Sequence, residues 1–181
     1  MGDADYVVPD NSELAEKVKE YFPYYDFVLD GDTLVDVVKT EQDISEIIQQ
    51  KKSEVSADCE KAITAGVDVG DNHYSLTVED QANILAWMPL AQAGQAVPYH
   101  ADGQACRIYS AKEFMEVANA AVAYKTHHTT YCNLLMRQIE GMTVANDIKA
   151  VKYGVTELAG EYKEQYDVIM GSLVGGNDET T

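Results

Sequence analysis

The closest approach to a reactive cluster in this sequence is the segment that holds His100, Asp102 and Cys106. A cysteine becomes a nucleophile when a histidine takes its proton and a third group orients the imidazole ring. Here an Asp-Gly turn already accounts for Asp102, and strand alternation predicts that Cys106 points inward. We therefore favour a structural role for these residues over a catalytic one.

Two further histidines, His127 and His128, adjoin on a predicted helix, where neighbouring side chains point about 100° apart and cannot share a metal ion. Cys132 adds only a second ligand to His128, whereas a structural zinc takes four. With Cys59 and Cys106, the three cysteines contain no Cys-x-x-Cys pair, so we expect buried, reduced thiols. The sequence predicts no catalytic residue, no metal, no cofactor and no enzymatic activity.

Helix caps, apolar spacing and turn residues predict the elements that carry these side chains. A kink or break is expected near Met88, because Pro89 lies inside a helical pattern. The helix after Thr40 is either an amphipathic helix packed on the following domain or, as the alternative, a self-sufficient coiled coil. In chain order the expected elements are a short helix between Ser12 and Pro23, a β-hairpin over 25–38, a helix over 41–65 capped by Thr40, a two-stranded element over 67–76, a helix over 78–93 with a Thr77 and Asp80 capping box, a hairpin over 97–109, a helix over 111–140 with a Ser110 and Glu113 capping box, a short helix capped by Thr143 and extending to about Tyr153, and a helix over 157–170 before a flexible end at 171–181.

These elements give an α+β fold, mostly α, with long helices packed with two small β-hairpins. An apolar stripe along the 30-residue helix over 111–140 predicts that this helix is the spine of the core. Its residues Ala118, Ala121, Cys132 and Leu135 are expected to be buried against the helix over 78–93. The expected core residues of this helical domain are Trp87, Phe114, Ala118, Ala121, His128, Cys132, Leu135 and Ile139.

Charge restricts the class of partner. The chain of 181 residues has a formal net charge of -18, which argues against binding to nucleic acid through a basic face. Sixteen acidic and five basic residues fall within the first 60 positions. No apolar stretch is long enough to span a membrane, and the acidic start lacks a signal-peptide pattern, so we expect a soluble protein made in a cytosol.

Apolar residues interrupt the acidic front of the chain at regular spacing, so we expect it to fold and to dock through them. Twelve tyrosines against three phenylalanines agree with an interface, because tyrosine combines an apolar ring with a polar tip. The residues expected to contact a partner are Leu14, Val18, Tyr21, Tyr24, Tyr25, Phe27, Val28, Leu34 and Val37.

Three motifs in fixed order carry a resemblance over residues 73–154. They are Tyr74-Ser-Leu-Thr-Val-Glu-Asp-Gln-Ala-Asn-Ile, Gln95-Ala-Val-Pro-Tyr-His-Ala-Asp-Gly-Gln-Ala-Cys-Arg-Ile-Tyr-Ser, and Tyr124-Lys-Thr-His-His-Thr-Thr-Tyr-Cys-Asn-Leu-Leu. This stretch resembles an uncharacterised domain family of tailed bacteriophages and prophages, found in tail-fibre or baseplate-associated proteins. The resemblance implies a structural or adaptor role in a virion and supplies no catalytic residues.

The resulting expectation is a structural or adaptor protein of a phage tail tip, baseplate or fibre attachment. It would contact other tail proteins and further copies of itself, in a virion assembled in the bacterial cytoplasm. A tail-fibre assembly chaperone and an acidic DNA mimic that inhibits a host enzyme are the alternatives. The expected divisions are an acidic attachment segment over 1–40, a connecting helix over 41–66, the phage-tail-associated helical domain over 67–154, and a C-terminal helix with an acidic end over 155–181.

Overall fold

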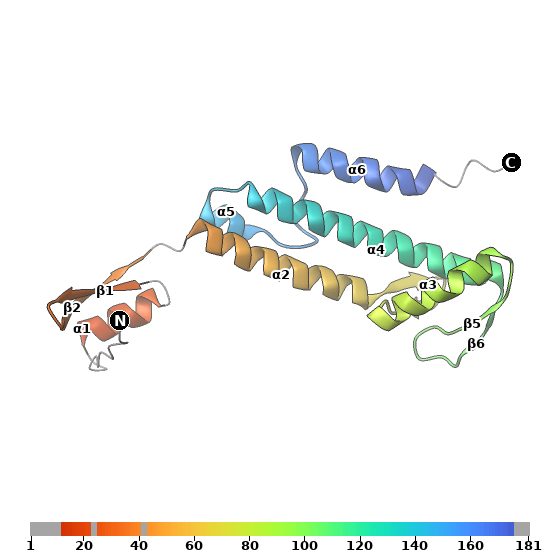
Figure 1. The fold of residues 1–181 in the computed structure, drawn as a ribbon, viewed down its shortest axis with the longest axis horizontal. Coiled ribbons are helices and arrows are strands. Elements are labelled where there is room, and N and C mark those ends of the chain that lie inside the picture. The colour runs from red at the N-terminus through yellow and green to blue at the C-terminus, as the bar shows by residue number, and fades with distance from the viewer. Residues whose placement is uncertain (1–11, 23–24, 41–42, 176–181) are drawn as a thin grey trace. The chain divides into compact units, whose positions relative to one another are not determined.

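The computed structural model describes residues 12–22, 25–40 and 43–175 of the chain (Figure 1). The structure is 61% helical, and its described residues form six helices and three two-stranded antiparallel sheets. The fold is therefore α+β and mostly α, as the sequence predicts. The chain divides into two compact units, Met1–Ile47 and Ile48–Thr181, which are described separately.

The described residues of the N-terminal unit before residue 41 form one helix and one hairpin. Helix α1 spans Glu13–Tyr21, and the Ser12 side chain caps it by accepting a hydrogen bond of 3.1 Å from the Ala15 N–H. Strands β1 (Tyr25–Asp30) and β2 (Thr33–Lys39) pair antiparallel. Both elements confirm the sequence prediction, because a good cap and an Asp-Gly turn are local signals.

Helix α1 packs on β2 and buries Ala15 and Val37. An ion pair of 2.8 Å joins the Lys17 ammonium to the Asp36 carboxylate and fixes the helix on the strand. The register shifts after Val28, so that Val35 has no partner on β1 and forms a β-bulge.

Helix α2 spans Ile44–Ala65 and starts later than predicted. The side chain of Asp43 accepts a hydrogen bond of 2.9 Å from the Ser45 N–H, so Asp43 caps the helix where the sequence suggested Thr40.

One side of α2 is buried at steps of four residues, through Lys51, Val55, Cys59 and Ile63. The Lys51 ammonium donates a hydrogen bond of 3.1 Å to the Val151 carbonyl, which lies 100 positions away in the chain. The helix therefore packs on its own unit as an amphipathic helix and is not an isolated coiled coil.

A small hairpin follows α2, formed by β3 (Val67–Val69) and β4 (Asn72–Tyr74). Gly66 joins the helix to the hairpin with a φ of +91°, and a β-carbon at this position would lie 2.2 Å from the Tyr74 carbonyl oxygen. Only glycine fits this close approach of two backbone segments.

Helix α3 spans Val78–Gln92 and begins with the predicted capping box. The Thr77 hydroxyl accepts from the Asp80 N–H at 3.2 Å, and the Asp80 carboxylate accepts from the Thr77 N–H at 3.1 Å. A kink or a break was expected near Met88. The helix continues through Pro89 for three more residues, so it is not broken there.

Strands β5 (Val97–Tyr99) and β6 (Arg107–Tyr109) form the third hairpin and lead into helix α4 (Ala111–Glu140). Ser110 caps α4 as predicted, and Gly141 ends it. The capping box is incomplete, however, because the Glu113 carboxylate pairs with Arg107 of β6 instead of the cap.

Helix α4 is the spine of the second unit, as expected (Figure 1). Its first half packs with α3 and the two short hairpins around Tyr99, Tyr109 and Phe114. In its second half Cys132 contacts the Val55 carbonyl of α2 and not α3, contrary to the prediction. Trp87 and His128 are half-buried, so these two expected core residues lie at the margin. The other expected core residues are buried: Phe114, Ala118, Ala121, Cys132, Leu135 and Ile139.

Two shorter helices complete the second unit. Helix α5 spans Ala145–Ala150, and its cap position is Val144 without a side-chain hydrogen bond, so the predicted Thr143 cap is wrong. Helix α6 spans Gly160–Gly175 and packs along α4 (Figure 1). The end predicted to be flexible from residue 171 is thus helical up to Gly175, and its remainder lies outside the described residues.

Candidate functional site

The structure does not assemble His100, Asp102 and Cys106 into a reactive cluster. Cys106 is exposed, contrary to the prediction, because β6 begins only at Arg107 and strand alternation does not reach Cys106. The His100 imidazole stacks on Tyr99, and within the described residues it forms no hydrogen bond with Asp102 or Cys106.

Asp102 instead joins two hairpins. Its carboxylate accepts hydrogen bonds from the Ser75 hydroxyl and, at 3.1 Å, from the Ser75 N–H. Burial favours the neutral acid, but these hydrogen bonds and the nearby His73 and His100 outweigh it and lower the pKa of Asp102. The carboxylate is therefore an acceptor that holds the loop before β6 on the segment after β4.

The two histidines at the centre of α4 bind tyrosine hydroxyls. His127 Nδ1 is hydrogen-bonded to the Tyr166 hydroxyl of α6, and His128 Nδ1 lies 2.8 Å from the Tyr153 hydroxyl. Burial, together with the neighbouring His127, lowers the pKa of His128. These contacts tie α4 to the segments that come after it in the chain, and they agree with the structural role favoured for His128.

Cys59 and Cys132 are buried where α2 faces α4, and neither is prepared for nucleophilic attack. The Cys59 thiol donates to the His128 carbonyl at 3.4 Å, and the Cys132 thiol contacts the Val55 carbonyl at 3.9 Å. Burial and contact with Cys59 raise the pKa of Cys132, which keeps this thiol protonated. In the part of the chain that the structure describes, no three His, Cys, Asp or Glu side chains are grouped to hold a metal ion.

The N-terminal unit carries the residues expected to contact a partner, and the structure distributes them unevenly. Val37 is 2% exposed because α1 covers it, so Val37 belongs to the small core of this unit. Phe27 and Val28 are exposed, by 45% and 37% of their surface. Tyr24 lies outside the described residues, and the remaining expected contacts are half-buried: Leu14, Val18, Tyr21, Tyr25 and Leu34.

Both faces of the hairpin present apolar side chains. Phe27 pairs with Val37 and so lies on the face that α1 partly covers, whereas Val28 and Val38 lie on the opposite face. Val38 was not among the residues expected to contact a partner. Val37 and Val38 are neighbours in a strand, so only one of them can face α1. We call the exposed apolar residues of this element the hairpin surface: Phe27, Val28, Leu29, Val35 and Val38.

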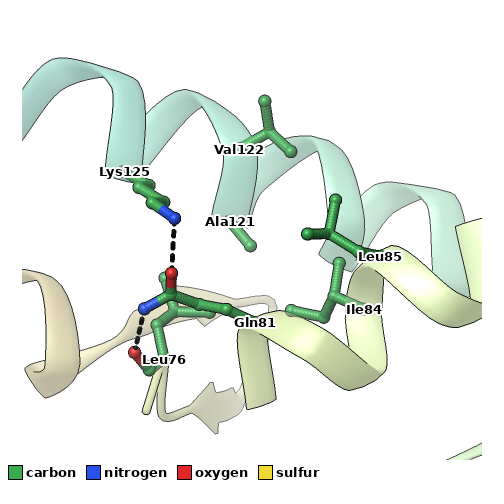
Figure 2. Close-up of a pocket in the computed structure, with 7 residues that line it drawn as sticks. All are labelled: Leu76, Gln81, Ile84, Leu85, Ala121, Val122 and Lys125. Atoms are coloured by element: carbon green, nitrogen blue, oxygen red, sulfur yellow. Dashed lines mark hydrogen bonds between the residues drawn. The ribbon is translucent and has the colours of Figure 1, made fainter. Parts of the chain in front are cut away.

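A hollow of about 50 Å³ lies between α3 and α4 in the second unit (Figure 2). Two polar side chains stand at one end, where the Lys125 ammonium donates a hydrogen bond of 2.5 Å to the Gln81 amide oxygen. The Gln81 amide nitrogen in turn donates to the Leu76 carbonyl at 2.8 Å. Apolar side chains form the rest of the wall: Leu76, Ile84, Leu85, Ala121 and Val122.

A second, larger hollow of about 240 Å³ adjoins the first and shares Gln81 and Lys125 with it. Residues of α2 form its other side, among them Ser56, Glu60 and Thr64. Neither hollow could be predicted from the sequence, because their walls come from three helices and no single motif contains them.

The comparison with protein families identifies the second unit. Residues 46–154 match the family described as Domain of unknown function (DUF4376). The chain belongs to this family. The matched range includes nearly all of α2, whereas the resemblance seen in the sequence begins only at residue 73. No curated protein and no solved structure matches the chain.

The DUF4376 domain thus comprises α2 to α5 with two of the small hairpins, and both hollows lie within it. Among the described residues, no helix combines the length and the apolar character that a membrane crossing needs.

Proposed function

We propose that this chain is a structural or adaptor protein of a bacteriophage tail, which works through protein-protein contacts and catalyses no reaction. The hairpin surface attaches it to a neighbouring tail protein at the tail tip, at the baseplate or where the fibres attach. The placement in a phage tail rests on the resemblance of residues 73–154 to tail-associated proteins.

The exposure of the hairpin surface is the observation that supports attachment. Phe27, Leu29, Val35 and Val38 each expose between 44% and 49% of their surface, in a unit whose described residues before α2 form one helix and one hairpin. Burying such side chains against a partner removes apolar area from water, and this is the main driving force of association. A two-stranded sheet also has strand edges that can pair with a strand of another protein.

A non-catalytic role is supported by how the chemically capable side chains are used. Asp102, His127 and His128 take part in hydrogen bonds between segments of the fold, and the Cys132 thiol is buried. Each of these contacts is explained by the packing of the second unit.

The test is a pair of double variants of the full chain, each of which removes two exposed valines. Val28→Ser with Val38→Ser alters the hairpin surface, whereas Val155→Ser with Val168→Ser is the matched control in the second unit. Full burial of a valine contributes about 1.5–3 kcal/mol, so the hairpin variant should be depleted from purified particles by about tenfold or more. Quantitative mass spectrometry of the particles measures this.

The control should be incorporated like the unaltered chain. Equal incorporation of the hairpin variant would place the attachment elsewhere. If the unaltered chain itself is absent from mature particles but bound to fibre proteins during assembly, the protein is an assembly chaperone instead.

A further inference from the structure

The smaller hollow between α3 and α4 has the dimensions of one aliphatic side chain. Its volume of about 50 Å³ is a fraction of the roughly 150 Å³ of a cavity that admits benzene, so an aromatic ring does not fit. An aliphatic group in the hollow would leave water and contact apolar side chains, which is favourable. The apolar residues of the wall are Leu76, Ile84, Leu85, Ala121 and Val122. Leu85 is 62% exposed and Val122 39%, so the hollow opens to solvent and a ligand can enter it.

The polar end of the hollow fits an anion. The Lys125 ammonium has three donors, and Gln81 accepts from it at 2.5 Å. Lys125 forms no ion pair with any residue that the structure describes. The Gln81 side chain is held by the Leu76 carbonyl, so that its oxygen stays turned toward the ammonium (Figure 2). A carboxylate beside Lys125 would gain a charge-assisted hydrogen bond.

The larger hollow can hold the rest of a ligand whose carboxylate lies at Lys125. It adjoins the smaller one at Gln81 and Lys125, and its volume of about 240 Å³ leaves room for further residues. Ser56 lines this hollow, and a serine hydroxyl can bond to a peptide group. The Thr64 hydroxyl already donates to the Glu60 carbonyl at 2.9 Å, so it can only accept from a ligand. Glu60 also lines this hollow and disfavours a second anionic group there.

We propose that the DUF4376 domain of this chain binds the C-terminus of a partner polypeptide whose last residue is aliphatic. The terminal side chain enters the hollow between α3 and α4, the terminal carboxylate pairs with Lys125, and the preceding residues lie in the larger hollow. This is a second binding site, separate in sequence from the hairpin surface and independent of the assembly to which that surface attaches.

The probes are the peptide acetyl-Ala-Ala-Leu with a free carboxylate and the same peptide as its C-terminal amide, each titrated against the full chain by NMR. The free acid should shift the methyl signals of Ile84, Leu85 and Val122, while the amide should bind about tenfold more weakly, because it lacks the charge-assisted bond. Acetyl-Ala-Ala-Phe should bind poorly, because its ring exceeds the hollow.

Two variants of α4 make the test specific. Lys125→Met removes the ammonium and should reduce affinity for the free acid by about tenfold, to the level of the amide. Lys112→Met removes an exposed lysine of the same helix and should bind like the unaltered chain. Both lysines are exposed, so both variants should keep the melting temperature.

Equal binding of acid and amide, or unchanged binding by the Lys125 variant, would overturn the carboxylate site. If 4-methylpentanoate binds as tightly as the peptide acid, the site takes small aliphatic acids and the polypeptide partner is wrong.

Discussion

At the scale of single residues, the titratable side chains mainly link segments of the fold through hydrogen bonds. Two histidines do so, and their pKa values are shifted in opposite directions. His73 lies between two acceptors, with Nδ1 2.7 Å from the Asp68 carboxylate and Nε2 2.7 Å from the Ala65 carbonyl. An imidazole donates from both nitrogens only when it is protonated. The bond to Asp68, together with the weaker effect of the bond to Ala65, raises the pKa of His73 above its ordinary value of 6.5, whereas burial lowers that of His128.

Replacing His73 by Gln should therefore destabilise the protein in a pH-dependent way. Because the pKa of His73 is higher in the folded protein than in the unfolded chain, the protonated imidazole stabilises the fold. This stability is fully present below pH 6.5, the pKa in the unfolded chain, and is lost as the pH rises through the pKa in the folded protein. We expect the melting temperature of His73→Gln to fall furthest below that of the unaltered chain near pH 5, and the difference to shrink at alkaline pH. Thermal unfolding followed by circular dichroism across this range measures it.

The matched control is His100→Gln, since His100 is exposed and its ring is hydrogen-bonded only to the adjacent Ala101 carbonyl among the described residues. This control loses the stacking on Tyr99 and a small charge effect on Asp102, so its loss of stability near pH 5 should be smaller than that of His73→Gln. If His73→Gln lowers stability by the same amount at pH 5 and pH 9, His73 stabilises the fold through packing alone, and the charge of its protonated imidazole makes no contribution.

The contacts of two lysines could not be predicted from the sequence. Lys51 is a charged residue that interrupts the apolar seam a coiled coil over 41–65 would need. It is nevertheless only 9% exposed, because the Val151 carbonyl, 100 positions away, accepts a hydrogen bond from it. Lys125 likewise becomes part of a site only through Gln81 and the hollows beside it, which three helices build. A contact between distant segments leaves no local signal at either residue.

At the scale of elements, predictions were accurate where both ends of an element carry a local signal. Thr77 with Gly94, and Ser110 with Gly141, place α3 and α4 almost to the residue. The start of α5 was misplaced because Thr143 does not cap it. Its Ile148 is 0% exposed, so packing of the helix on the core, and not a cap, accounts for it.

The turn between α2 and β3 gives a prediction at this scale. Gly66→Ala should destabilise the protein strongly, because alanine strains at a φ of +91° and its β-carbon would overlap the Tyr74 carbonyl. Gly70→Ala, at a φ of +62° with open space around it, should cost only the roughly 1–2 kcal/mol of a left-handed backbone.

The difference between the two glycine variants in free energy of unfolding, from urea titration, isolates the steric part. Equal losses would show that the backbone near Tyr74 can move aside at no cost.

At the scale of the whole molecule, the division into two units agrees with the family match. The DUF4376 range begins at residue 46, and the second unit begins at Ile48. The first unit carries a large share of the acidic residues and, in α1 and one hairpin, has little apolar area of its own to bury. Its stability is therefore expected to depend on a partner more than that of the second unit does.

Removing the N-terminal unit tests this division of roles. A variant that begins at Glu41 keeps the Asp43 cap of α2 and the whole of the second unit. It should still unfold in one cooperative transition, because the buried core around Phe114, Leu135 and Ile148 is complete without residues 1–40. It should nevertheless be absent from purified particles, since the hairpin surface that is proposed to attach the chain has been removed. Calorimetry measures the first outcome and mass spectrometry of particles the second.

Normal incorporation of the variant into particles would assign attachment to the helical domain or to α6. A broad, non-cooperative thermal transition would show that the family domain needs the N-terminal unit to fold.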